Sequence, residues 1–306
     1  YGANTGVGSM KDKLWTADDL VEFNNNLVKA HHFGTGEPFA LPIVRKAIAI
    51  RVNTALGGYS GCSPELIDAF LGLLKRDVVP VVRRHGSMGC ADIGLMGQVA
   101  AVLTGEGEAW YGGERLPAAE ALKRAGLAPY RMQPRDALAA LSVNAISHAA
   151  AANVVREAAK AIRNLMVTGL LSSLALGASA DPWRVAARLS AHGESLAGAW
   201  FEAQAASGHW PKPSAIHDPL SLRMTAQVFG ACLDTLMNAA ERIVEATAQS
   251  DDNPVVLDNV VMASGGSLPL STTLYVEAAQ TGFAHLARRS EEHTSEIQSH
   301  SDLVCR

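Results

Sequence analysis

Three segments near the start of the chain combine phenol, imidazole, amide or guanidinium groups with glycine turns. The first, YGANTGVG, carries Tyr1 in a glycine-rich loop, but its glycines lack the spacing of a phosphate-binding loop. In NNNLVKAHHFGTGEPF at 24–39, the adjacent His31 and His32 point in different directions on a helix, so they are not expected to share a metal ion. In RVNTALGGYSG at 51–61, an arginine and an asparagine precede a glycine turn. Turn and capping chemistry alone would also explain each segment.

Composition excludes several classes of protein. Of the 306 residues, 48% are apolar and 18% are charged, which predicts a large core and not a disordered chain. The net charge of -4 is too weak and too mixed to favour nucleic acid or a membrane surface as partner. No uninterrupted apolar run reaches the roughly 18 residues of a membrane span. The four cysteines form no CxxC pair, so we expect no zinc site, no disulfide framework and a cytoplasmic location.

Helical patterns must position these groups. Apolar residues recur at helical spacing after Thr16 and after Ser63-Pro64, and a third apolar helix is predicted from Asp92 to Leu103. Alanine-rich patterns without an internal proline cover 136–176 and 220–249. Long apolar helices of this kind need neighbours on several sides. We therefore predict an all-α fold, an elongated helical bundle with a smaller, loop-rich N-terminal helical domain, whose helices continue into other subunits. Short extended pieces are expected around 110–114 and 255–262.

The last eighteen residues, RSEEHTSEIQSHSDLVCR at 289–306, break from the alanine-rich pattern. They resemble a translated sequencing adapter: the first eleven match RSEEHTSELQS except at Ile297, and LVCR follows in the same reading frame after the adapter's index bases. We interpret 289–306 as an artefact of sequencing that was never selected to pack, and we expect the natural chain to be a fragment cut at both ends.

Seven segments, taken in order, resemble the aromatic amino acid ammonia-lyases, the family of histidine, phenylalanine and tyrosine ammonia-lyases. The matching motifs are YGANTGVG, NLVKAHHFGTGEP, RVNTALGGYSG, HGSMGCADIGLMGQVAAVLTGEGEA, DPLSLR, DDNP and SGG. The order of the motifs makes the resemblance specific, and it covers the whole chain before the tail. The family's place for Ser-His, a pair typical of histidine ammonia-lyases, is Ala30-His31 here, so the resemblance leans towards that branch.

The resemblance implies a fold, a reaction and a cofactor. Members are homotetramers that eliminate ammonia from an amino acid, using a methylidene-imidazolone electrophile that forms from an Ala-Ser-Gly triad in the chain itself. No metal or nucleotide is implied, and Tyr1 would be the base that takes the β-proton. By resemblance, 1–130 is the N-terminal electrophile-loop domain and 131–288 is an incomplete central bundle of long helices.

The electrophile triad departs from the family pattern. Between Gly89 and Asp92 stand only Cys90 and Ala91, where the family has three residues. The cofactor-forming residues would then be Gly89, Cys90 and Ala91, with the thiol of Cys90 as the leaving group and the methyl group of Ala91 crowding the sharp turn. The other interpretation is a small cysteine that packs in a loop before a helix.

Further site residues are carried over by position. The family's catalytic asparagine falls at Ser142, with Asn144 two residues further on, and the motif's arginine, Arg223, would bind the substrate carboxylate through its planar fork. Ala30, His31 and Leu220 would contact the substrate, Leu220 standing where the family has tyrosine.

Two functions remain open. The first is an ammonia-lyase acting on histidine or an aromatic amino acid. The second is a catalytically impaired or non-enzymatic relative that keeps the oligomeric helical scaffold. A third class, the helical lyases of the fumarase and aspartase group, is disfavoured because their GSSxMPxKxN loop is absent.

Overall fold

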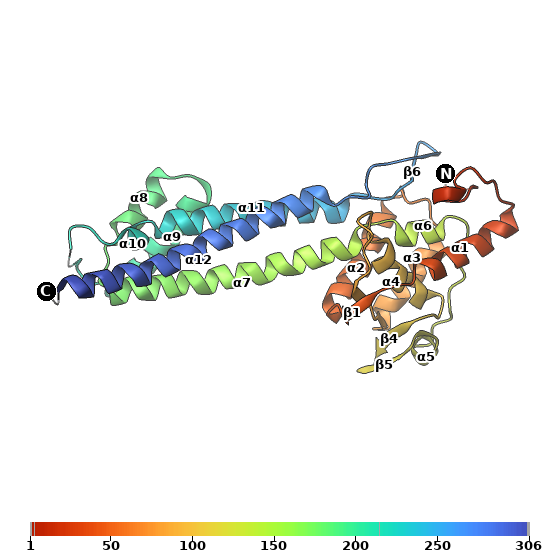
Figure 1. Ribbon diagram of the computed structural model, residues 1–306, viewed down its shortest axis with the longest axis horizontal. Helices are drawn as coiled ribbons and strands as arrows, with labels where there is room; N and C mark the ends of the chain where they lie inside the picture. Colours follow the sequence, from red (N-terminus) through yellow and green to blue (C-terminus); the bar gives the residue numbers. More distant parts are fainter. Residues whose placement is uncertain (1, 3, 214, 305–306) are drawn as a thin grey trace. The chain divides into compact units, whose positions relative to one another are not determined.

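The computed structural model describes residues 2, 4–213 and 215–304, and for Ala17 and 289–304 it describes the backbone alone. The chain forms two compact units (Figure 1). The first contains Tyr1–Asn153 and Ile243–Leu270, and the second contains Val154–Arg242 and Ser271–Arg306. Each unit is considered by itself below.

The first unit is built mainly of short helices with small antiparallel sheets. Its elements in chain order are η1 (Gly8–Met10), α1 (Ala17–His31), β1 (Thr35–Pro38), α2 (Leu41–Leu56), α3 (Pro64–Lys75), β2 (Val79–Pro80), β3 (Arg83–His85), α4 (Ile93–Leu103), β4 (Glu108–Tyr111), β5 (Glu114–Pro117), α5 (Ala118–Arg124), α6 (Asp136–Leu141), the start of α7 (Ala145–Ala175), the end of α11 (Thr225–Ala248), β6 (Val255–Leu257) and β7 (Val260–Met262). The sheets pair β1 with β3, β2 with β4 and β5, and β6 with β7.

Helix α4 is the centre of the first unit. Every residue from Gly94 to Leu103 is buried, and apart from Gln98, whose side chain is hydrogen-bonded to Arg83 and Gly94, this segment is apolar on all sides. Ile48 of α2, Phe70 of α3 and Leu141 of α6 belong to the same core. The start of α4 is therefore fixed by packing, and with it the loop that immediately precedes the helix.

The sequence predicted one long helix over the alanine-rich pattern from Asp136 to about 176, but the structure has two helices there. The structure ends α6 at Leu141 and begins α7 at Ala145. Between them, the carbonyl of Val143 accepts a hydrogen bond from the amide of Asp92 (2.9 Å), and the amide of Asn144 donates to the carboxylate of Asp251 (2.6 Å). These distant partners replace helical hydrogen bonds, which a local hydrophobic pattern cannot reveal.

The second unit is a bundle of helices. It contains most of α7 and α11, together with α8 (Asp181–Leu189), α9 (His192–Ala206), α10 (Leu220–Arg223) and α12 (Leu270–Val304). Trp183 of α8 stacks on Phe201 of α9, with ring centroids 5.1 Å apart. α9 and α11 approach closely, because a methyl group on Gly193 would lie 2.2 Å from the carbonyl oxygen of Gly230.

The mainly helical fold confirms the expected class, and hairpins β4–β5 and β6–β7 confirm the extended pieces expected near 110–114 and 255–262. The contact-based boundary at 153/154 differs from the motif-based division at 130/131, which stays a prediction. Segment 136–175 is long and apolar enough to cross a membrane, with a mean hydropathy of 1.4 in its most apolar window. However, 56% of that window is buried inside the protein, as in the core helix of a soluble protein.

Helix α12 enters the adapter-like tail. The alanine-rich pattern ends before 289, but the backbone continues as helix to Val304. Arg, Glu and Gln residues tolerate helical geometry, so an unselected polar segment can extend an existing helix without packing. The side chains of 289–304 and all of 305–306 lie outside the described residues, and the prediction that the tail does not pack stays a prediction.

Deleting 289–306 is expected to change the free energy of unfolding by about 0.5 kcal/mol or less, the range of substitutions that touch no packed feature. Chemical denaturation measures this difference. The matched control deletes 283–306 and thereby removes Leu286, which is buried in the core of the second unit. It should cost roughly 2–5 kcal/mol, as for the loss of a buried leucine. Equal losses in the two deletions would refute the interpretation of the tail.

Candidate functional site

A cavity of about 220 Å³ lies in the first unit and collects several of the predicted site residues. Its walls come from the end of α1, the loop before α4, the end of α6 and the turns that follow α11. Its lining residues are Val7, Gly8, Leu27, His31, Cys90, Ile93, Leu138, Leu141, Ser142, Asn253 and Ser267. Apolar side chains form most of the wall, and His31, Cys90 and Ser142 bring an imidazole, a thiol and a hydroxyl to it. A small-molecule site has this mixture of apolar walls and a few polar groups.

The loop that carries Cys90 has an unusual backbone. Gly89 and Ala91 both have left-handed φ angles, of 74° and 50°. This conformation is easy for glycine but strained for alanine, so tertiary contacts must hold Ala91 in place. The amide of Ala91 donates a 2.6 Å hydrogen bond to the carbonyl of Ser267. The loop is therefore tied to the turn that lines the same cavity.

His31 has a defined tautomer in its neutral state. Its Nδ1 lies 2.8 Å from the carbonyl oxygen of Leu27, one helical turn earlier. A carbonyl oxygen only accepts hydrogen bonds, so we assign the hydrogen to Nδ1, which leaves the lone pair of the neutral ring on Nε2. With its ring lining the cavity, His31 can offer this acceptor to a substrate.

A buried polar cluster lies behind the loop. The Oδ2 atom of Asp251 accepts hydrogen bonds from the backbone amide and the side-chain Nδ2 of Asn144, at 2.6 and 2.8 Å. The same Nδ2 donates to the carbonyl of Gly266 at 2.7 Å. Asn144 is 1% exposed and thus joins the cluster instead of lining the cavity, whereas Ser142 lines it.

Asp92 is the second carboxylate of this cluster. Its Oδ2 accepts from the amide of Ser147 and its Oδ1 from the Ser147 hydroxyl, each at 2.7 Å. Asp92 thus caps the amino terminus of α7, where a negative charge is favourable. Burial nevertheless raises the pKa of Asp92; the hydrogen bonds from Ser147 oppose this shift, and the charge of Asp251 adds to it.

His148 faces Asp251 within the cluster, with Nε2 and Oδ2 3.7 Å apart. Burial lowers the pKa of His148, against the attraction of Asp251, because imidazolium is disfavoured away from water. Burial also raises the pKa of Asp251, against its hydrogen bonds with Asn144 and the charge of His148. Both shifts favour the neutral forms of this pair.

Next to Asp251, Asp252 is anchored by Arg51. The guanidinium of Arg51 donates two hydrogen bonds to the carboxylate of Asp252, at 3.1 and 3.0 Å, and both side chains are almost fully buried. A bidentate pair of this kind fixes geometry as well as charge. The segment after α11 is thereby held against α2.

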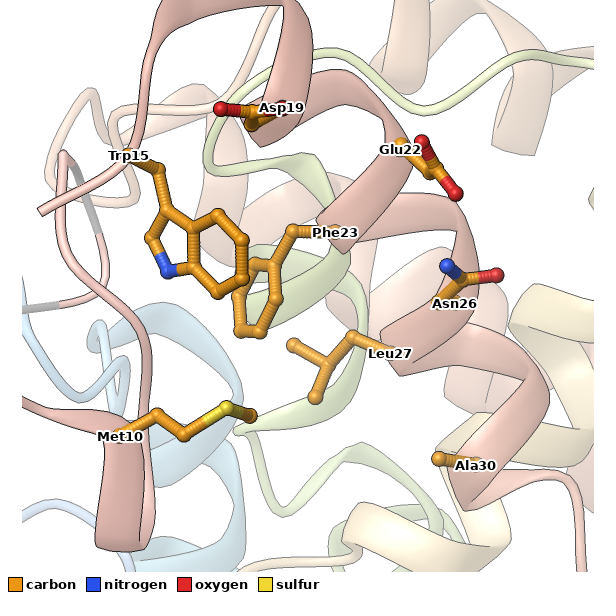
Figure 2. Close-up of a pocket in the computed structure, with 8 residues that line it drawn as sticks. All are labelled: Met10, Trp15, Asp19, Glu22, Phe23, Asn26, Leu27 and Ala30. Carbon is orange, nitrogen blue, oxygen red and sulfur yellow. The ribbon is translucent and has the colours of Figure 1, made fainter. Parts of the chain in front are cut away.

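The other predicted site residues lie elsewhere. Ala30 lines a separate hollow of about 400 Å³ on α1, beside Leu27 and the stacked rings of Trp15 and Phe23 (Figure 2). Leu220 and Arg223 belong to the second unit; Leu220 is exposed, and the Nε of Arg223 donates to the carbonyl of Asp218 at 3.0 Å. Tyr1 lies outside the described residues.

Sequence reasoning missed Asp92, Asp251 and His148 as members of one polar cluster. Asp92 and Asp251 stand in matched motifs, but their partner His148 lies in an alanine-rich helix and carries no local signal. Among the described residues, no group of three or more His, Cys, Asp or Glu side chains is arranged to hold a metal ion.

The lowered pKa of His148 makes stability depend on pH. Between its folded-state pKa and 6.5, the unfolded chain binds more protons than the folded protein, so stability should fall as pH falls through this window. His148→Gln should flatten the slope there, by at most about 1.4 kcal/mol per pH unit for one proton. Denaturant unfolding at several pH values measures this slope. The control His209→Gln, at an exposed site, should keep the wild-type slope; a wild-type slope in His148→Gln as well would contradict the assignment.

Comparison with known proteins places the chain in a family. A family model described as aromatic amino acid lyase matches residues 1–301. The chain is 35% identical to the histidine ammonia-lyase of Paracidovorax citrulli over 87% of its own length and 54% of that protein. It is also 35% identical to the histidine ammonia-lyase of Stigmatella aurantiaca, over 95% of this chain and 60% of the relative. The chain thus spans about half the length of the curated relatives it matches.

Solved structures agree with the sequence match. The ergothioneine-degrading enzyme ergothionase of Treponema denticola, crystallised with desmethyl-ergothioneine sulfonic acid, has a TM-score of 0.89 and 27% identity, over 95% of this chain and 60% of that one. The histidine ammonia-lyase of Trypanosoma cruzi has a TM-score of 0.84 and 25% identity, over 95% of this chain and 56% of that one. The chain belongs to the aromatic amino acid lyase family.

Proposed function

We propose that the whole protein to which this chain belongs is a carbon–nitrogen lyase that eliminates ammonia from histidine or an aromatic amino acid. The observation that carries the proposal is the cavity of the first unit, to which two segments that resemble family motifs contribute His31 and Cys90, and to which Ser142 contributes from the position of the family's asparagine. The similarity to histidine ammonia-lyases supports histidine as the first substrate to test.

His31, Ser142 and the apolar wall of the cavity would each have a part in the proposed reaction. His31 would accept a hydrogen bond at Nε2 from a substrate ring N–H, and the apolar wall around Leu138 and Leu141 would surround the ring and exclude water. Ser142 would donate a hydrogen bond to the substrate. By resemblance, Arg223 would bind the carboxylate and Tyr1 would take the β-proton.

The family's methylidene-imidazolone would make the amine a better leaving group. The residues present do not fit this group. The triad is one residue short, and the amide nitrogen that would have to close the ring, that of Ala91, donates its hydrogen to Ser267. Ala91 also has a φ of 50°, which is strained for a residue with a methyl side chain. No step of the proposed reaction is therefore assigned to this electrophile.

This disagreement favours a second candidate substrate, the betaine ergothioneine. Its amine is already quaternary, so it can leave as neutral trimethylamine once a base removes the β-proton, with no electrophile to activate it. The similarity to the ergothioneine-degrading enzyme at 27% identity supports this candidate. The two candidates share one cavity and one elimination reaction and differ in the leaving group.

We also propose that the whole protein is a homotetramer. Exposed apolar side chains on the long helices of the second unit support this proposal, because such side chains are expected to pack against another protein surface. They include Leu165, Leu171 and Leu174 on α7, and Leu274 and Tyr275 on α12.

An assay of the full-length protein tests the lyase proposal. Incubation with histidine, phenylalanine, tyrosine and ergothioneine should release ammonia or trimethylamine together with a conjugated acid, detected by its near-ultraviolet absorbance and by mass spectrometry. Arg223→Lys should raise KM by more than it lowers kcat, because the lysine ammonium loses the bidentate contact with the carboxylate. Release of neither amine by a folded tetramer would reject the proposal and support the non-enzymatic relative.

A further inference from the structure

We infer that the turn Ser264–Ser267 holds the Gly89–Cys90–Ala91 loop as an open peptide, so that Cys90 remains a free thiol at the wall of the cavity. The inference rests on the proposed function only in taking this cavity as the reaction site. It concerns the covalent state of the loop, and its test does not depend on turnover. Ser267 and its neighbours are therefore positioning residues for the loop.

The first step is the contact between turn and loop. The carbonyl of Ser267 accepts the 2.6 Å hydrogen bond from the amide of Ala91, and both Ser267 and Cys90 line the cavity. The next amide along, that of Asp92, donates to the carbonyl of Val143 at 2.9 Å. Two successive backbone amides thus donate hydrogen bonds to carbonyl groups outside the loop.

The second step is the anchoring of the turn itself. Asn144 donates to the carbonyl of Gly266 (2.7 Å), and Asp251 binds Asn144. The amide of Ser264 donates to the side-chain oxygen of Asn253 at 3.0 Å. The turn is therefore fixed by the buried Asn144 on one side and by the half-buried Asn253 on the other, and it can hold the loop in one conformation.

The third step is close backbone packing at Gly266. A methyl group on this residue would lie 2.6 Å from the carbonyl oxygen of Asp251 and within 3 Å of its carbonyl carbon, so only glycine lets the turn approach this closely. Gly265, its neighbour, has no atom within 4 Å of the same position. Substitution of Gly266 can therefore test the contact, and the same substitution at Gly265 is the matched control.

The contact opposes the chemistry of ring closure. Closure would need the nitrogen of Ala91 to bond to the carbonyl carbon of Gly89, whose oxygen would leave as water with the hydrogens of the Ala91 and Cys90 nitrogens. The Cβ–Sγ bond of Cys90 would then break, with loss of a Cα proton and release of hydrogen sulfide. Closure would have to break the hydrogen bond from Ala91 to Ser267, because the nitrogen must give up this hydrogen, and the turn that carries Ser267 is held by the buried cluster through the carbonyl of Gly266.

Peptide mass spectrometry of the full-length protein tests the covalent state. The peptide that contains Cys90 should have its full mass and should be alkylated by iodoacetamide at Cys90. A peptide lighter by one water and one hydrogen sulfide would overturn the inference. In Cys90→Ser, the thiol is replaced by the family's own leaving group, and the peptide should still keep its full mass. Loss of two waters there would overturn the inference, because the leaving group and not the turn would then prevent closure.

Hydrogen exchange tests the role of the turn. Gly266→Ala should push the turn away from Asp251 and speed exchange at the Ala91 amide about two- to tenfold, the factor that corresponds to one ordinary hydrogen bond. Gly265→Ala should exchange like the wild type. Equal exchange in all three proteins would show that the turn does not hold the loop.

The outcomes separate this inference from the proposed function. A full-mass peptide in a protein that releases no amine would reject the lyase and keep the inference. A dehydrated peptide in an active ammonia-lyase would reject the inference and keep the lyase. Release of trimethylamine by a protein with a full-mass peptide would support both.

Discussion

The hydrogen bond from the amide of Ala91 to the carbonyl of Ser267 joins two segments that are 176 positions apart in the chain. Strain at Ala91, which has a left-handed backbone, is tolerable only because this contact and the one from Asp92 to Val143 hold the loop. The position of Cys90 in the cavity follows from the same contacts. The break between α6 and α7 also depends on them, because Val143 lies in it.

Burial of two carboxylates and an imidazole around this contact requires nearly complete hydrogen bonding. Asp92 uses the amino terminus of α7, and Asp251 uses the backbone and the side chain of Asn144. Burial shifts the pKa values of Asp251 and His148 towards the neutral forms, which lowers the cost of holding them away from water. The cluster therefore fixes the turn and the loop at a modest electrostatic cost.

Local patterns could predict most of the helices but not the groups that position the site. Ser63 is an N-cap whose side chain accepts from the amide of Leu66, as its place before Pro64 suggested. The motif around His31 correctly indicated a residue at the cavity. Ala30, one residue earlier, lines another hollow, because neighbouring positions on a helix point in different directions. No local sequence pattern indicated the role of His148, because its partner Asp251 is far away in the sequence.

The central claim is that this member of the lyase family combines the fold of its relatives with an uncyclised loop at the cavity of its first unit. A high-resolution crystal structure of the full-length assembled protein tests it most directly. We expect continuous density for an open peptide at 89–91, a complete thiol on Cys90, and the Ala91 amide within hydrogen-bonding distance of Ser267. Density for a five-membered ring closed between Gly89 and Ala91, with no sulfur on the central residue, would contradict the claim.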